Sequence, residues 1–227
     1  MKGAKKKMAR LAAIIALAVV PLLLVSVTKA ASGSASSVLG TVKEIKNGRI
    51  ERQQNGVWKA LGIGGKLFAY DKVRTDSSGM AVLHLDGIGN FLIGPHTEYT
   101  LGDNPLNFKT ILHRGFVWFK SQLPAGALMD ISASNAVAGV RGTRFSVLAD
   151  NQGVDFCTCE GSVAVTTAAG KIVSVGSGMS STVRKDGAAS TPGKGKALLA
   201  KQWRKETARY ASCTHCHSKG KKPRDLL

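Results

Sequence analysis

The chain has 227 residues and four cysteines. This length is enough for one domain with additional segments, and the cysteine content is too low for a small disulfide-stabilised scaffold. The net charge of +18 lies mostly at the two ends, because residues 1–30 carry +6, residues 31–183 carry +3 and residues 184–227 carry +9. A nearly balanced centre argues against a nucleic-acid-binding domain.

Residues 1–30 have the layout of an export signal. A basic stretch ends at Arg10, an apolar run spans residues 11–27, and small residues surround Ala30. This order is typical of a secretory signal peptide, here with cleavage after Ala30. The alternative is an uncleaved anchor in the inner membrane, because an apolar run of this length is at the short limit of a span. Both interpretations place the rest of the chain in the periplasm or outside the cell, where disulfides can form.

The centre of the chain, from about residue 38 to residue 183, is predicted to be all-β. Short β-branched or aromatic stretches alternate with turns rich in Gly, Asn and Asp, and no helical period is sustained. This pattern favours a β-sandwich, a barrel or a β-solenoid. The expected strands are Met80–Leu85, Phe91–Ile93, Thr97–Leu101, Phe116–Phe119, Val137–Val140, Arg144–Leu148, Val154–Cys159, Val163–Thr167 and Lys171–Val175.

Several segments of this region resemble the FecR domain family, and they follow one another in the order found in that family. The most specific segment is Val140–Val147, which contains Arg-Gly-Thr-x-Phe, and we expect Gly142 to form its turn. The resemblance covers roughly residues 40–183 and implies a FecR-type β domain over residues 38–183. The other segments that carry the resemblance are residues 65–87, 92–97, 112–117, 160–165 and 175–178.

The founding members of that family are inner-membrane regulators of iron uptake with a cytoplasmic anti-sigma segment. Only about ten residues precede the apolar run in this chain, so direct control of a sigma factor is not expected. The resemblance therefore implies an exported binding or signalling module, and it carries over no ligand-binding residue.

The residues after the β region divide into a linker and a basic tail. Residues 184–195 are rich in Gly, Ala, Ser and Thr, which is typical of a flexible linker. In residues 196–227, the positions Leu199, Trp203 and Tyr210 fall on one face of a helix. We therefore expect a short C-terminal α-helix in a basic tail.

The tail contains the motif Cys213-Thr214-His215-Cys216-His217. The Cys-x-x-Cys-His spacing is typical of covalent haem c attachment, with Cys213 and Cys216 bonded to the vinyl groups and His217 as a ligand of the haem iron. Only ten residues follow His217, and none of them is Met. The sixth iron ligand would therefore come from another subunit, be absent, or come from the β domain, where the candidates are His84, His96, His113, Met129 and Met179.

The other cysteines form the pair Cys157-Thr158-Cys159 in an expected strand, where both side chains point to the same face. Together with Cys213 and Cys216, they are an alternative four-cysteine zinc site. Two disulfides between the tail and the domain, or a redox-active thiol pair, are the other interpretations.

No catalytic residue emerges from the sequence, so we expect no enzyme and no small-molecule substrate. The leading hypothesis is an exported FecR-domain protein with haem c that acts in electron transfer or in redox or ligand sensing at the cell envelope. The alternative is a FecR-like binding or signalling module without haem, in which zinc or disulfides hold the cysteines. The expected partners are an envelope or redox protein and an anionic membrane surface that the basic tail would contact, and not nucleic acid.

Overall fold

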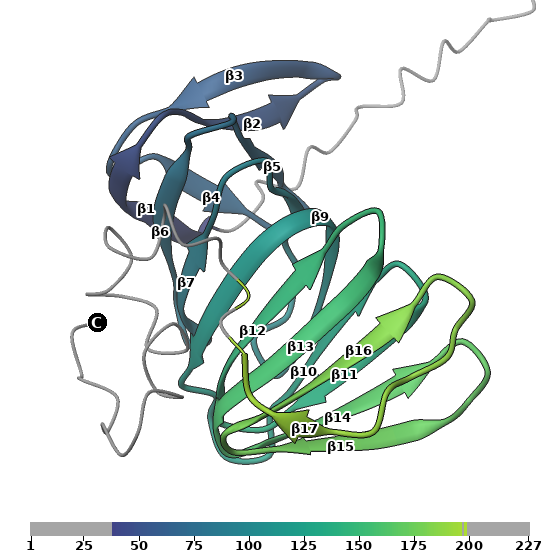
Figure 1. Cartoon of the computed structure of the whole chain (residues 1–227). Coiled ribbons are helices and arrows are strands. Elements are labelled where there is room, and N and C mark those ends of the chain that lie inside the picture. The colour runs from purple at the N-terminus through teal and green to yellow at the C-terminus, as the bar shows by residue number, and fades with distance from the viewer. Residues whose placement is uncertain (1–37, 197, 199–227) are drawn as a thin grey trace, which may run out of the picture. The chain divides into compact units, whose positions relative to one another are not determined.

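The computed structural model describes residues 38–196 and residue 198, and all its regular elements are β-strands (Figure 1). The all-β prediction is confirmed. The expected C-terminal helix and the export signal lie outside the described residues. Within those residues there is no helix with the length and apolar character that a membrane span requires.

The strands form two sheets, which we call sheet A and sheet B. Every neighbouring pair in sheet A is antiparallel. In spatial order, sheet A consists of β4 (Lys66–Phe68), β1 (Val38–Asn47), β6 (Met80–Leu85), β7 (Gly89–Ile93), β9 (Asn107–Ser121), β12 (Arg144–Ala149), β13 (Gly153–Glu160), β16 (Met179–Arg184) and β17 (Gly193–Lys194).

Sheet B is antiparallel except where β9 and β10 run parallel. In spatial order, sheet B consists of β3 (Val57–Leu61), β2 (Ile50–Gln54), β5 (Lys72–Thr75), β8 (Glu98–Thr100), β9, β10 (Leu128–Ala133), β11 (Ala136–Val140), β14 (Ser162–Thr167) and β15 (Ile172–Gly176).

Strand β9 belongs to both sheets. Its first half pairs with β8 and β10 in sheet B, and its second half pairs with β7 and β12 in sheet A. The two halves meet near Gly115, which has a φ of 91°. A Cβ atom at Gly115 would lie only 2.4 Å from the Cα of Thr97. Glycine is therefore required here both for its backbone conformation and for the close approach of a neighbouring segment.

The inner faces of the two sheets enclose one hydrophobic core, which is the arrangement of a β-sandwich. Its centre is aromatic, since Phe119 packs against Phe91 and Phe145 with ring centroids 4.7 Å apart in each pair. All three side chains are fully buried. Full burial of a side chain of this size stabilises the fold by about 1.5–3 kcal/mol. All three belong to sheet A, and the ring contacts of Phe91 with Phe108 and of Phe119 with Tyr99 join this group to sheet B.

The chain stays on the edge of sheet A after β16, where the sequence favoured a flexible linker. Val183 forms a bridge with Ala189, and β17 pairs with β16 through Gly193 and Lys194. The Oγ of Ser190 accepts a hydrogen bond from the backbone N–H of Thr182. Residues 184–194 are therefore held on the sheet by backbone contacts. A composition rich in Gly and Ser does not predict these contacts.

Candidate functional site

The outer faces of the two sheets differ in burial, and β9 displays the difference within one strand. From Asn107 to Leu112, exposed and buried residues alternate, as expected for a strand with one face in water. From Phe116 to Phe119, four consecutive residues are buried. The outer face of sheet A is therefore covered at β9, whereas the outer face of sheet B is open to solvent.

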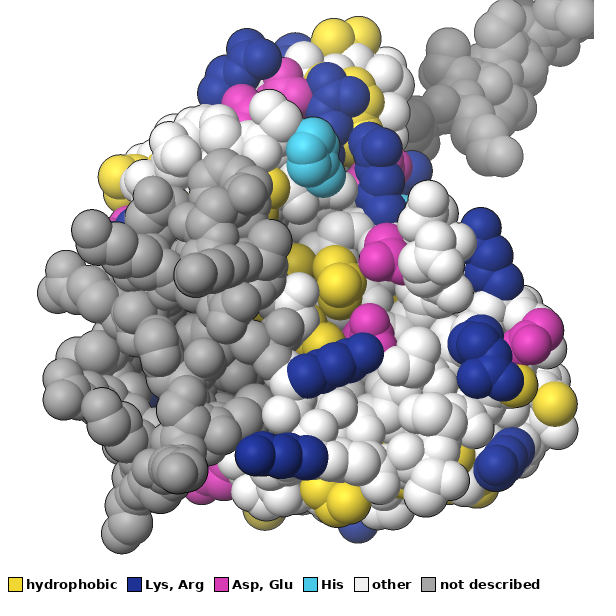
Figure 2. All heavy atoms as spheres, viewed as in Figure 1, with side chains coloured by type: hydrophobic (Ala, Val, Ile, Leu, Met, Phe, Trp, Pro, Cys, Tyr) yellow, Lys and Arg dark blue, Asp and Glu magenta, His cyan; other side chains and the backbone are white. Residues whose placement is uncertain are grey.

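A second hydrophobic cluster lies on this outer face of sheet A, and we call it the outer cluster. Its members are 0–7% exposed and come from β6, β7, β9 and β13. Figure 2 shows hydrophobic side chains gathered between charged ones on the face in view. The cluster comprises Val82, Leu92, Phe116, Trp118 and Cys159, with Leu148 and Leu198 packed against it.

Two polar atoms in this region are buried and have no hydrogen-bond partner among the described residues. They are Nε1 of Trp118 and Oγ of Ser146, which lie on directly opposed residues of β9 and β12. Both residues are 1% exposed. A buried polar group without a partner costs about 1–3 kcal/mol, so this site is suited to receive a segment that offers hydrogen-bonding groups.

The cysteine pair of β13 borders the same face. Val154 and Phe156 point into the main core, so the alternate residues Cys157 and Cys159 point outward. Cys157 is a fully buried thiol, and Cys159 is disulfide-bonded. The sulfur atom of a disulfide is not the thiolate that a zinc ion requires, so Cys159 offers no zinc ligand in this oxidised form.

The remaining site residues proposed from the sequence, Cys213, Cys216 and His217, lie outside the described residues. Their haem or zinc ligation is therefore untested. Among residues 38–196 and 198, no group of three or more His, Cys, Asp or Glu side chains is placed to hold a metal ion.

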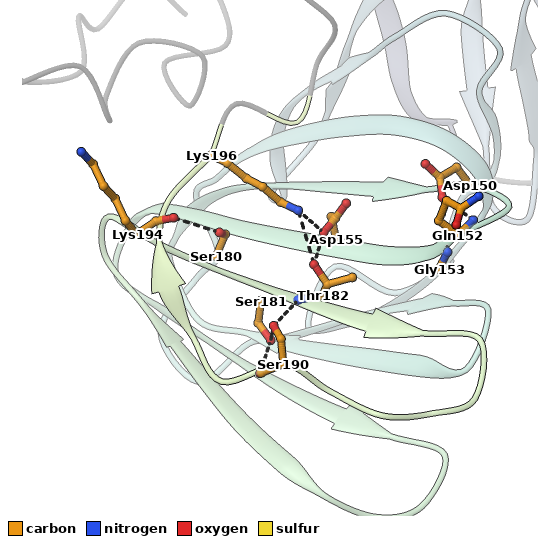
Figure 3. Close-up of polar contacts among 10 residues, drawn as sticks. All are labelled: Asp150, Gln152, Gly153, Asp155, Ser180, Ser181, Thr182, Ser190, Lys194 and Lys196. Carbon is orange, nitrogen blue, oxygen red and sulfur yellow. Dashed lines mark hydrogen bonds and ion pairs between the residues drawn. The ribbon is translucent and has the colours of Figure 1, made fainter.

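The last described residues approach the outer cluster along a fixed route. The backbone N–H of Gly195 donates to the carbonyl of Gly178 at 2.7 Å. Lys196 Nζ then lies 2.8 Å from a carboxylate oxygen of Asp155 and 3.4 Å from Oγ1 of Thr182, and Thr182 also donates to Asp155 (Figure 3). Two positions later, Leu198 packs on the outer cluster.

The three histidines considered as axial haem ligands lie at separate places. His84 is on the outer face of sheet A, and its Nδ1 is 3.0 Å from Oδ1 of Asn90. His113 lies on sheet B, with Nε2 2.8 Å from Oγ1 of Thr100. His96 is exposed in a turn at a φ of 54°. Of the three, His84 is the one on the same face as the outer cluster.

The two methionines considered as axial ligands pack in or against the main hydrophobic core. Met129 is fully buried in the main core, and Met179 packs against that core from β16. Met129 cannot reach an iron atom outside the sheets without opening the core packing, whereas Met179 is only partly buried.

The Arg-Gly-Thr-x-Phe segment lies at the end of sheet B. Gly142 has a φ of 54°, as expected for a turn, and a Cβ atom there would meet no neighbour within 4 Å. The requirement for glycine is thus conformational. Arg141 lines two shallow hollows of about 200 and 480 Å³. The smaller is completed by Leu123, Pro124, Gly126, Ala127 and Gly142.

The outer face of sheet B carries charged pairs. The Nε of Arg74 is 2.7 Å from a carboxylate oxygen of Glu51, and its guanidinium group lies 4.2 Å from the ring centroid of Trp58. Glu98 lies 3.4 Å from Lys72 and 3.7 Å from Arg114. This face satisfies its polar groups with its own side chains.

Sequence reasoning did not single out Trp118, Ser146 or Asp155. A signal for Trp118 was present, because a fully apolar run such as Phe-Val-Trp-Phe indicates a strand that is buried on both faces. No local signal identifies Ser146 or Asp155, since their roles depend on which strands become neighbours.

Comparison with known proteins supports the FecR resemblance for the centre of the chain. Residues 71–164 match the family described as FecR protein, which is less than half of the chain. This part of the chain is therefore FecR-like. A comparison with curated proteins found no match.

One crystal structure shares the fold at low sequence identity, and a second structure is also similar. One, described as a putative anti-sigma factor from Parabacteroides distasonis ATCC 8503, has a TM-score of 0.51 and 14% identity, and the match covers 58% of this chain. Another structure with the same description and source has a TM-score of 0.49 and 13% identity, and it covers 54% of this chain. The chain spans 63% and 59% of those two proteins, respectively, and this likeness concerns the fold alone.

Proposed function

We propose that this protein is an exported FecR-like signalling module of the cell envelope, in which the two-sheet domain makes contact with a protein partner. The observation that carries the proposal is the FecR match over residues 71–164. The fold shared with a structure described as an anti-sigma factor supports a regulatory role. The signal-like residues 1–30 support export.

A reporter fusion tests the export part of this proposal. Alkaline phosphatase joined after residue 183 is active only in an oxidising compartment, so we expect activity with residues 1–30 present and none when they are deleted. Extraction of membranes at alkaline pH then separates a cleaved, periplasmic protein from an anchored one. Equal activity with and without residues 1–30 would overturn export by this segment.

The tail gives this module its proposed cofactor, a haem c bound through Cys213 and Cys216 with His217 on the iron. Once bound, haem supplies an iron atom that changes oxidation state and takes up small ligands, which is the chemistry needed for electron transfer or for redox and ligand sensing. The basic residues of the tail would dock an acidic redox partner or an anionic membrane surface.

A pyridine haemochrome spectrum tests the haem directly. The protein is produced with its signal in a host that attaches haem c, then denatured and extracted with acidified solvent. We expect a c-type α band that stays with the protein, and loss of that band in Cys213→Ala and Cys216→Ala. The variant Cys157→Ala is the matched control, because Cys157 lies outside the haem motif and should leave the band unchanged.

A second candidate is a FecR-like module without haem in which the cysteines are structural. The specific observation in its favour is that Cys159 is disulfide-bonded. Under this candidate, the exported protein shows no haem band, and its mass identifies either disulfides or one bound zinc ion per chain. Elemental analysis for zinc, before and after treatment with a chelator, separates these two outcomes.

A further inference from the structure

The larger of the two hollows beside Arg141 lies on the outer face of sheet B, between β10, β11 and β14. Its volume is about 480 Å³, and its lining includes Leu128, Asp130, Arg141, Ser162 and Ala164. Sites for small molecules in proteins commonly have volumes of about 300–1,000 Å³. The volume of this hollow is therefore in the range of a small-ligand site.

The floor of the hollow is open because one of its residues is a glycine. Gly139 lies opposite Asp130 on β10 and opposite Ala164 on β14. A Cβ atom at Gly139 would lie 3.7 Å from Oδ1 of Asp130 and 3.8 Å from the carbonyl oxygen of Ala164. Gly139 does not have a positive φ, so its backbone conformation does not require a glycine. What the glycine provides here is space between the strands.

Two opposite charges line this hollow without pairing with each other. Within the part of the chain that the structure describes, no ion pair or side-chain hydrogen bond involves the carboxylate of Asp130 or the guanidinium group of Arg141. Lys109 lies opposite Asp130 on β9 and forms no ion pair with it. By contrast, Glu51 and Glu98 on the same sheet each pair with an arginine. The two charges of the hollow are therefore available to a ligand.

The spacing of the two charged residues suits a ligand that carries charges of both signs. Arg141 directly follows β11, two positions after Gly139, so it is a diagonal neighbour of Asp130 across the two strands. Diagonal neighbours in a sheet are about 7–8 Å apart. The carboxylate of Asp130 would repel a simple anion, and the guanidinium group of Arg141 would repel a simple cation. A molecule with both charges is attracted by both side chains.

We propose that this hollow binds a small zwitterion, either an apolar α-amino acid or a dipeptide of such amino acids. The ligand's carboxylate accepts hydrogen bonds from Arg141, and its ammonium group donates hydrogen bonds to Asp130. An apolar side chain of the ligand packs on Leu128, which is 43% exposed. Such a ligand is distinct from the protein partner and from the haem proposed above.

An NMR titration of the isotope-labelled full chain tests the site with two probes, L-leucine and L-leucyl-L-leucine. We expect at least one probe to produce saturable shifts of the backbone amide signals of Gly139, Arg141 and Ala164. The probe that binds more tightly identifies whether the zwitterion is an amino acid or a dipeptide. The absence of a saturable shift with both probes would overturn the proposal.

Two charge variants test the roles of the side chains. Arg141→Gln and Asp130→Asn should each weaken binding of the tighter probe by about tenfold or more, because each removes a charge-assisted interaction. The matched control is Arg114→Gln, which removes an arginine charge from the same sheet at a place outside the hollow. This control should leave the affinity unchanged. An unchanged affinity in both charge variants would show that the hollow does not bind the probe as proposed.

Blocked forms of the tighter probe test the two ends of the ligand separately. The N-acetylated form lacks the ammonium group and the C-terminal amide lacks the carboxylate, so each should bind about tenfold more weakly than the probe. Asp130→Asn should not weaken the acetylated form further, and Arg141→Gln should not weaken the amide further, since the paired group is already missing. Equal affinity of the probe and both blocked forms would contradict recognition of a zwitterion.

The variant Gly139→Ala tests the hollow without changing a charge. The added methyl group meets Asp130 and Ala164 at ordinary contact distances, so the domain should fold normally. It occupies the floor of the hollow, and we expect it to weaken binding at least about fivefold, as overpacking does. If Gly139→Ala binds the probe as tightly as the unaltered chain does, the ligand does not occupy this hollow and the proposal is wrong.

Discussion

The outer face of sheet A and the outer face of sheet B are built from the same kind of strand but end in opposite environments. On sheet B, charged and exposed residues alternate with buried ones along β10, β14 and β15. On sheet A, strand β7 is buried at all of its positions and β6 at all but His84. The comparison shows that two sheets joined through a shared strand can have outer faces in different environments. The outer face of sheet A is buried, whereas the outer face of sheet B is in water.

The physical origin of the difference is the choice of residues at the outward positions. Glu51, Arg74 and Glu98 face outward on sheet B and pair with neighbouring charges. Val82 and Trp118 occupy outward positions on sheet A, where exposure of their apolar side chains to water would be unfavourable. Four predictions test this contrast, from the largest expected effect to the smallest.

Replacement of Trp118 in the outer cluster should show the largest difference in stability between the two faces. Because Trp118 is 1% exposed, we expect Trp118→Ala to lower the free energy of unfolding by about 3–5 kcal/mol. The matched change on the open face, Val137→Ala, should cost no more than about 0.5–1 kcal/mol. Urea unfolding of both variants measures this, and similar small losses would mean that the outer cluster is not a packed interior.

The strand that joins the two sheets is the next test. Gly115→Ala combines an unfavourable φ with a collision against the backbone of Thr97, so we expect a loss of at least about 3 kcal/mol. Gly170 has a similar φ of 78° but no neighbour within 4 Å of a Cβ atom. Gly170→Ala should therefore cost only about 1–2 kcal/mol. Thermal unfolding of the pair isolates the contribution of the close contact, and equal losses would argue against it.

One ion pair on each face gives a smaller effect. Asp155→Asn removes the contact with Lys196 next to the outer cluster, and Glu51→Gln removes the contact with Arg74 on sheet B. Both pairs are partly exposed, so each should contribute about 1 kcal/mol or less, and less in high salt. We expect only Asp155→Asn to accelerate proteolysis at Lys196, because that pair holds the end of the described chain. Acceleration by Glu51→Gln as well would indicate general loosening.

The smallest expected effect is a pH dependence on sheet B. Burial lowers the pKa of His113, nearby Lys72 lowers it further, and Glu98 acts in the opposite direction. The folded state therefore binds this proton less readily than the unfolded state, whose pKa is about 6.5. Stability should fall as the pH drops below that value, until the lower folded pKa is passed. In His113→Gln, the urea midpoint should change less over this window, whereas an unchanged slope would exclude His113 as the cause.

Periodicity predicted the fold class well, because it depends on neighbouring residues. Alternation along Met80–Leu85 and the apolar stretch Phe116–Phe119 correctly placed strands. The turn at Gly142 is confirmed by its positive φ. The order of strands within the sheets could not be predicted in this way, since it depends on contacts between residues distant in sequence.

The candidate site was harder to predict for the same reason. The outward direction of Cys157 and Cys159 follows from strand geometry, and the structure agrees with it. Their neighbours Trp118 and Ser146 come from other strands, and no sequence pattern predicts that these strands lie side by side. Residues 184–194 also differ from expectation, because pairing with β16 outweighs a composition that favours a linker.

The position of β9 has a consequence for how the domain assembles. Among the described strands, none of β1–β8 pairs with any of β10–β17, so every backbone ladder between the two groups passes through β9. A chain that emerges from its N-terminus first would have to complete β9 before either sheet could close, and these long-range pairings favour slow folding. The same strand should make unfolding a single cooperative event, since neither group of strands retains a complete sheet without it.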